Sequence, residues 1–200
     1  IRQLVAHATR HSLGPYHAVG LALTGELAIA RGDSSVGVPV LRDALAVLQT
    51  ERHHVLTPAF HRALAEGLVQ SGEVDEAAAV LDAATMRSEG GVATSSGSEL
   101  LRMRGEISIR TTPADPAAAE QSFLQSLQLA KEQSALSLEL RSAMGLARLW
   151  ASAGRASDAV DLLQPVYRQF GEGHATADLI IAGQLLAELG CRAGPLDATG

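Results

Sequence analysis

The chain has 200 residues and a net charge of −6, and hydrophobic residues make up 46% of it, against 3% for aromatic residues. A core must therefore be built from Ala, Leu and Val, and alanine and leucine are strong helix formers. Neither half has the strongly basic field of a nucleic-acid-binding protein. A single cysteine excludes an internal disulfide, and without a signal peptide or a long apolar span we expect a cytoplasmic protein with no membrane contact.

Turn and capping residues divide the chain into helices that we expect to pack as antiparallel pairs. Proline is tolerated in a first helical turn, Ser, Thr and Asp cap helix N-termini, and glycine ends helices with a positive φ. In chain order we expect helices at 1–11, 15–31, from the turn at 32–35 to 51, 57–70, 74–87, 99–110, 117–133, from a cap at Ser134 or Ser137 to 153, 157–170 and 177–189.

Three segments depart from this regular pattern. Residues 89–98 have the composition of a long flexible loop, and residues from Gly190 onward have that of a frayed tail. Pro165 falls inside an expected helix and should kink it.

One pattern occurs four times: a small residue, a turn glycine seven positions on, then small–x3–bulky–x2–small. Two small residues let the backbones of a helix hairpin approach closely, and the bulky residue fills the gap towards the next pair. A fixed period of this length indicates stacked helix pairs, which usually bind partners. The copies are Gly25, Gly32, Gly37, Leu41, Ala44; Ala65, Gly72, Ala77, Leu81, Ala84; Gly105, Ala119, Phe123, Ser126, with a longer turn and no turn glycine; and Ala147, Gly154, Ala159, Leu163, Val166.

The spacing resembles the tetratricopeptide repeat, with helices longer than its unit of about 34 residues allows. Several runs resemble the C-terminal helical-repeat region of large bacterial signalling ATPases, which carry either a winged-helix DNA-binding domain or a nucleotide-cyclase domain. They include SLGPYHAVGLALTGELAIARGD at 12–33, ERHHVLTPAFHRALAEGL at 51–68, ELLRMRGEI at 99–107, SLELRSAMGLARLW at 137–150, LLQPVYRQF at 162–170 and GHATADL at 173–179. His174 and Gly171 depart from the pattern of that family.

This resemblance spans about residues 12–190 and implies a regulatory role within a larger protein. The chain itself contains no phosphate-binding loop that ends in Gly-Lys-Ser/Thr. Because it begins at Ile1, within an expected helix, we interpret it as a fragment of such a protein.

Together these patterns predict an all-α fold: a right-handed superhelix of antiparallel helix pairs, arranged as a tetratricopeptide-like repeat array. We expect one domain over 1–200, with repeats at about 14–51, 55–88, 98–133 and 136–170 and a capping helix at about 176–189.

Charged residues repeat with the predicted fold. The i,i+4 pairs Arg62–Glu66 and Arg102–Glu106 lie 40 residues apart on the first helices of two pairs, and Glu26 takes the same place in the first repeat. In tetratricopeptide-like stacks this face lines a concave groove, which could dock a peptide, an acidic segment or the ATPase domain of the parent protein. The alternative is an internal ladder of salt bridges, which we favour for Arg62, Glu66 and Glu106.

In the fourth repeat Arg148 replaces the acid, and Arg141 lies seven residues before it. Because neither arginine has an acid at the ladder position, binding is the favoured role for both. We expect Arg102, Arg141 and Arg148 to be accessible on the concave side, where their planar donors suit a carboxylate-bearing partner.

Other candidate sites give weaker patterns. A zinc site needs three or four converging ligands, a serine hydrolase needs a Gly-x-Ser-x-Gly elbow, and a dinucleotide site needs a strand before its glycines. None of these occurs, so we expect no catalytic residue, no metal and no cofactor. The residues considered and interpreted as structural or incidental are His7, His11, His53, His54, His61, the serines of 95–98 and Cys191.

The function that we predict is a non-catalytic protein-interaction or sensor module, which regulates an ATPase-linked transcriptional regulator. Its partner would be a protein or peptide, such as the ATPase domain of the parent chain. Two alternatives stay open: a stand-alone scaffold for another protein, and a small-molecule-binding regulatory domain, which a buried apolar cavity with converging polar groups would favour.

Overall fold

The structure, a computed structural model, describes residues 1–53, 56–87, 97–111 and 114–193, and all regular structure there is helical. Most of the chain before residue 90 forms five helices. They are α1 (Arg2–Arg10), α2 (Gly14–Ala30), α3 (Ser34–Thr50), α4 (Thr57–Gln70) and α5 (Val74–Arg87). A further five follow: α6 (Gly97–Ser108), α7 (Pro116–Glu132), α8 (Leu136–Ser152), α9 (Ala156–Arg168) and α10 (Ala177–Ala193). The all-α prediction is confirmed.

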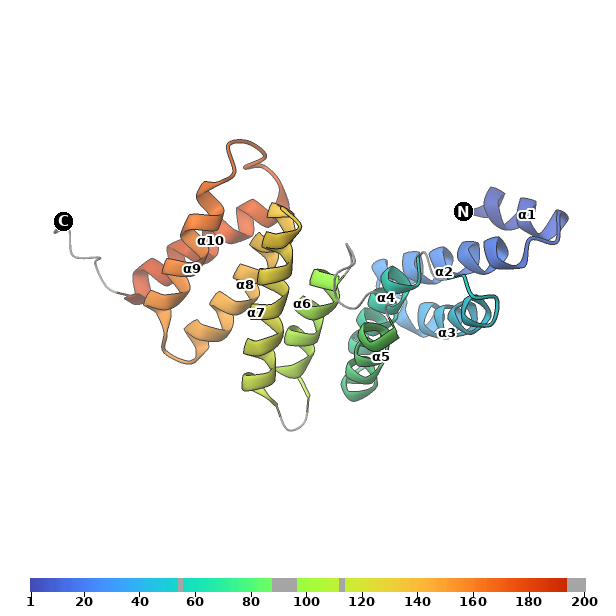
Figure 1. Ribbon diagram of the computed structural model, residues 1–200, viewed down its shortest axis with the longest axis horizontal. Coiled ribbons are helices and arrows are strands. Elements are labelled where there is room, and N and C mark those ends of the chain that lie inside the picture. The colour runs from blue at the N-terminus through green and yellow to red at the C-terminus, as the bar shows by residue number, and fades with distance from the viewer. Residues whose placement is uncertain (54–55, 88–96, 112–113, 194–200) are drawn as a thin grey trace. The chain divides into compact units, whose positions relative to one another are not determined.

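The helices form two compact units, each of which is described by itself: unit 1 contains α1–α5 and unit 2 contains α6–α10. Within them the pairs α2–α3, α4–α5, α6–α7 and α8–α9 pack as hairpins, as Figure 1 shows. Helix α1 packs on α2, and α10 packs on α9 and α8. A single continuous array over 1–200 stays a prediction.

The turns follow the expected capping chemistry. Gly32, Gly72 and Gly154 have φ values of 84°, 83° and 79°, which glycine adopts without strain. Asp33 accepts a hydrogen bond from the Val36 backbone N–H at 3.3 Å, and Asp115 accepts one from the Ala118 N–H at 2.9 Å. These caps satisfy donors that a helix N-terminus leaves without an internal partner.

Several predicted helix ends were wrong by two to four residues. Neither Ser134 nor Ser137 caps α8, because Ser134 has φ of 53° and the N-cap position falls on Ala135, which makes no side-chain cap bond. Helix α6 begins at Gly97 instead of Glu99 and ends at Ser108. Helix α10 continues past Gly190 to Ala193, so the tail predicted from Gly190 was wrong over those residues. One glycine costs a helix only about 1 kcal/mol, and the buried Leu189 outweighs it. The predicted loop at 89–98 falls mostly outside the described residues.

Close helix crossings lie where the repeat pattern predicted them. A Cβ placed on Gly25 would stand 3.0 Å from both the Gly37 carbonyl oxygen and Leu41 Cγ, so α2 and α3 are in near backbone contact. In unit 2 the ring of Phe123 fills the space between Gly105 and Gly145, where an added Cβ would come within 2.9 and 2.5 Å of it. Each of these crossings therefore depends on a missing side chain.

The first helix of each pair forms an inner row within its unit. Helix α2 packs beside α4, α6 beside α8, and α8 beside α10. Among the described residues the second helices of neighbouring pairs, α3 and α5 or α7 and α9, approach each other less closely. Each unit is therefore more tightly packed on the side of its first helices.

Candidate functional site

Ion pairs join the first helices of unit 1 to one another. The Arg62 guanidinium on α4 lies 3.0 Å from the Glu26 carboxylate on α2 and 3.5 Å from that of Glu66 on its own helix. The side chains of Arg62 and Glu26 are 31% and 30% exposed, which leaves them partly accessible. Arg62 and Glu66 thus take part in ion pairs of the kind that the interpretation as an internal salt-bridge ladder requires.

In unit 2 the ladder is more buried. Arg102 donates two hydrogen bonds to Glu99, at 2.9 and 2.8 Å, and one to Glu106. Its side chain is only 15% exposed, less than we expected of an accessible arginine. Burial works against the charged guanidinium, but its hydrogen bonds to Glu99 and Glu106 and the charges of these two carboxylates outweigh it and raise the pKa of Arg102 above its ordinary value. Arg102 is therefore a structural cation that stays charged in any working buffer.

Arg141 continues this network to the last helix. Its Nε donates a 2.7 Å hydrogen bond to Asp178 on α10, and its guanidinium lies 3.9 Å from Glu99 on α6. Arg141 is exposed, as predicted, but it has an acidic partner, contrary to the expectation that none stood at its ladder position. Arg148 is exposed and makes no ion pair with any side chain that the structure describes. Arg148 thus has the exposure expected of a binding arginine, and its place in a concave groove stays a prediction.

Sequence reasoning did not identify Glu99 and Asp178, although two spacings pointed to them. Glu99 precedes Arg102 by three residues, a helical neighbour spacing. Asp178 lies 37 residues from Arg141, close to the 36 that separate Glu26 from Arg62. In unit 1 the acid precedes its arginine along the chain, whereas in unit 2 it follows its arginine.

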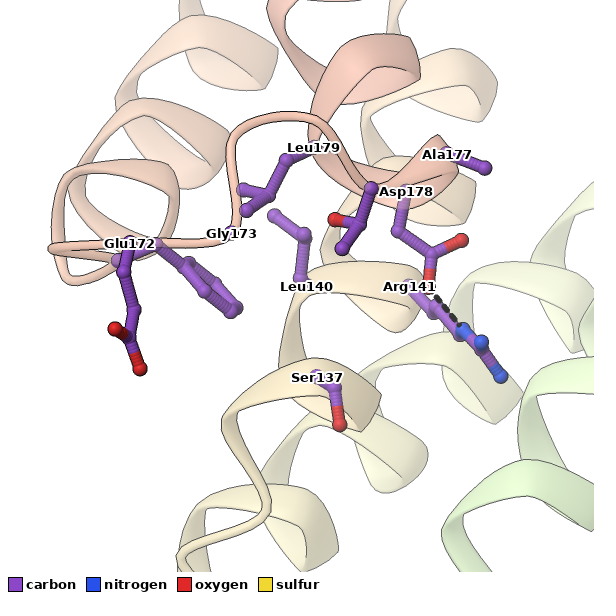
Figure 2. A pocket seen from close by; sticks show the side chains of 10 residues that line it. Ser137, Leu140, Arg141, Glu172, Gly173, Ala177, Asp178 and Leu179 are labelled. Carbon is purple, nitrogen blue, oxygen red and sulfur yellow. Dashed lines mark hydrogen bonds and ion pairs between the residues drawn. The ribbon is translucent and has the colours of Figure 1, made fainter.

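A pocket of about 440 Å³ opens beside Arg141 at the start of α8 and α10. Its floor is apolar and includes Leu140, Leu179 and Phe170, the first two buried. Figure 2 shows Leu140 and Leu179 at its centre, with the Arg141–Asp178 pair on one side and Glu172 on the other. The remaining lining residues are Ser137, Gly173, Thr176 and Ala177.

The loop between α9 and α10 forms one wall of this pocket. Gly173 has φ of 77°, and its carbonyl oxygen accepts a 2.8 Å hydrogen bond from the Thr176 N–H, which closes the turn that leads into α10. This turn places Glu172 in solvent, where it makes no ion pair with a described side chain. Of the three charged residues that line the pocket, Glu172 alone has an uncompensated charge.

The other candidates of the sequence analysis lie elsewhere. The rings of His7 and His11 are 4.4 Å apart, His53 lies against Tyr16, and His61 Nδ1 is 2.7 Å from the Thr57 carbonyl oxygen; His54 and residues 95–96 lie outside the described residues. Over the described part of the chain, no three His, Cys, Asp or Glu side chains are placed to hold a metal ion. Nor does any helix described here have the length and apolarity needed to cross a bilayer.

Known structures share this type of fold. The chain is similar to BtubC (BKLC) from P. vanneervenii, with a TM-score of 0.80 and 17% identity over 96% of this chain and 81% of that one. It is also similar to the nearly identical TPR-like repeats of a putative kinesin light chain from Podosopora anserina, with a TM-score of 0.70 and 16% identity over 91% of this chain and 89% of that one. The fold is tetratricopeptide-like. No protein-family model matches the sequence, and no curated protein matches it.

Proposed function

We propose that the chain is a non-catalytic protein-interaction module that docks a peptide or protein segment on the first-helix side of unit 2. The observation that carries this proposal is the pocket on that side, whose apolar floor of Leu140, Leu179 and Phe170 opens to solvent between charged walls. An apolar recess with a polar rim is the usual anatomy of a binding hot spot. The tetratricopeptide-like fold supports it, because stacked helix pairs present such surfaces to partners.

The binding role that the sequence suggested for Arg141 and Arg148 takes a more specific form in this proposal. Arg148 lies two helical turns from Arg141 on α8, or about 10 Å. A segment in extended conformation that fills the pocket would reach Arg148 within about three to four residues. We propose Arg148 as a second contact. Arg62 and Glu66 in unit 1, and Arg102 and Glu106 in unit 2, we regard as ladders that fix the first helices of their own units.

The setting that we propose is regulatory and cytoplasmic. The resemblance of the runs at 12–33 and 137–150 to the repeat region of bacterial signalling ATPases supports a role in controlling an ATPase-linked regulator. The segment that docks would then belong to the ATPase part of the parent protein or to a protein that signals to it. A volume of about 440 Å³ also lies within the range of small-molecule sites, so a small metabolite is the second candidate occupant.

A pocket-filling variant tests the docking proposal. Peptides would be selected on the purified chain from a random 12-residue phage library, and the affinity of a selected peptide would be measured by fluorescence anisotropy. Ala177→Trp should fill the pocket from the exposed first turn of α10 and weaken binding at least tenfold. Ala187→Trp, on an exposed site of the same helix but outside the pocket lining, is the matched control and should bind normally.

Two results would contradict docking at this pocket. One is a library that yields no binding peptide, and the other is equal affinity for the two tryptophan variants. Tight binding of a small metabolite in place of any peptide, lost in Ala177→Trp alone, would favour the second candidate.

A further inference from the structure

We infer that the pocket of unit 2 takes an apolar side chain whose neighbour in the partner is a lysine or arginine that reaches Glu172. This inference rests on the proposed docking function and adds the chemistry of the partner. It also reverses the expectation from sequence, in which arginines on this face would attract a carboxylate-bearing segment. The reversal follows from how the charged groups around the pocket are already paired.

The positive charge on the pocket wall is already matched. Arg141 Nε lies 2.7 Å from the Asp178 carboxylate, and Glu99 lies 3.9 Å from the same guanidinium. A partner carboxylate that reached the other N–H groups of Arg141 would lie close to Asp178 and Glu99, and repulsion by these like charges would cancel most of the gain. Arg141 is therefore a poor anchor for an acidic segment.

The helix N-termini at the pocket do not add an uncompensated positive charge. Helices α8 and α10 both begin there, and a helix N-terminus carries a partial positive charge. Each already has an acid in its first turn, however: Glu139 in α8 and Asp178 in α10. What remains at the pocket mouth is the exposed carboxylate of Glu172.

The apolar floor determines the other half of the motif. Leu140 is 1% and Leu179 is 3% exposed, so their side chains offer a small apolar surface at the base of the recess rather than a broad patch. One aliphatic or aromatic side chain would cover that surface. In Figure 2 Glu172 stands across the opening from the Arg141–Asp178 pair. A basic residue of the partner, next to the side chain that fills the pocket, would therefore lie over Glu172. The occupant is thus a peptide segment with an apolar residue beside a basic one.

A pair of synthetic peptides tests the charge preference directly. Both would carry the sequence of a library-selected peptide, but the residue next to its apolar anchor would be lysine in one and glutamate in the other. The unmodified chain should bind the lysine peptide two- to fivefold more tightly at low salt, the ratio expected of one exposed ion pair, and the preference should shrink in high salt.

Charge reversal at Glu172 should invert this preference. Glu172→Lys should bind the glutamate peptide better, and Glu172→Gln should bind the two equally. Glu188→Lys makes the same change in net charge at an exposed acid of α10 outside the pocket lining, so it controls for the overall field of the protein and should keep the lysine preference.

The inference is overturned if the glutamate peptide binds the unmodified chain better, or if Glu172→Lys and Glu188→Lys behave alike. In either case a peptide still binds, and the docking function survives without this motif. If neither peptide binds and the library yields none, the docking function itself fails.

Discussion

Gly25 and Gly37 show how single residues determine the approach of two helices. An added Cβ at Gly37 would lie 2.4 Å from Ile29 Cγ1 and 2.7 Å from the Gly25 carbonyl oxygen, so even alanine requires the pair to shift. The repeat pattern identified both glycines, because a small residue recurs wherever the two helices of a hairpin cross.

Larger side chains at these crossings should destabilise the fold. We expect Gly25→Leu to lower the free energy of unfolding by about 1–3 kcal/mol or more, because overpacking forces the backbones apart. Ala77→Leu, at a fully buried position, should behave alike. Gly14→Leu is the control, since nothing lies within 4 Å of the space its Cβ would take in α2. Urea unfolding followed by circular dichroism measures all three, and unchanged midpoints for Gly25→Leu and Ala77→Leu would refute the alignment of the repeats.

Contacts between single residues of neighbouring helix pairs were harder to predict from the repeat pattern. The pattern singled out Ala147 on α8, which is fully buried, but not Gly145, which makes room for the Phe123 ring from α7. A repeat pattern records positions that recur in every pair. Phe123 is a bulky ring at a place where other pairs have leucine, so the glycine that accommodates it is peculiar to this pair and leaves no periodic signal.

At the scale of the helices, the strength of each ion pair depends on how far it is buried. Arg102 is 15% exposed and its partner Glu99 is 17% exposed, whereas Arg42 and its partners Glu73 and Glu76 are each more than 40% exposed. Removing Arg102 would leave the partly buried carboxylate of Glu99 without its main partner, whereas removing Arg42 would leave only carboxylates that water already solvates.

Replacing each arginine with methionine, which keeps an apolar stem, should separate these two situations. We expect Arg102→Met to cost about 1–3 kcal/mol of unfolding free energy, because it leaves Glu99 and Glu106 with poorer partners. Arg42→Met should cost less than about 1 kcal/mol, and less still in high salt. Chemical denaturation at two salt concentrations checks both values. Equal costs for the two variants would show that burial does not govern the ladder.

Helix positions were largely predictable, whereas the ion pairs between helices were not. Turn glycines and aspartate caps located the breaks at 32–34, 72–74, and 154–156, since these residues act locally. Which side chains meet across helices depends on tertiary packing, and that is why Asp178 was missed as the partner of Arg141. Helix ends without a side-chain cap, such as the start of α8, were likewise misplaced by local rules.

For the molecule as a whole, the sequence determined the fold class but not the chemistry of its binding surface. Spacing and composition predicted helix pairs, and the likeness to solved tetratricopeptide-like structures confirms that fold. The pocket of unit 2 is formed by residues from two helices and the loop between α9 and α10, which no linear motif connects. The pocket is acidic because Arg141 is paired with Asp178, while the exposed Glu172 has no ion-pair partner among the described side chains.

Hydrogen exchange of the chain, with and without a library-selected peptide, tests the docking surface most directly. Docking at the pocket should slow exchange in the peptide complex at the start of α8 and over residues 170–180, where the pocket walls lie. The second helices α3 and α5 should exchange at unchanged rates. Protection confined to α3 and α5, with none at 170–180, would contradict docking on the first-helix side of unit 2.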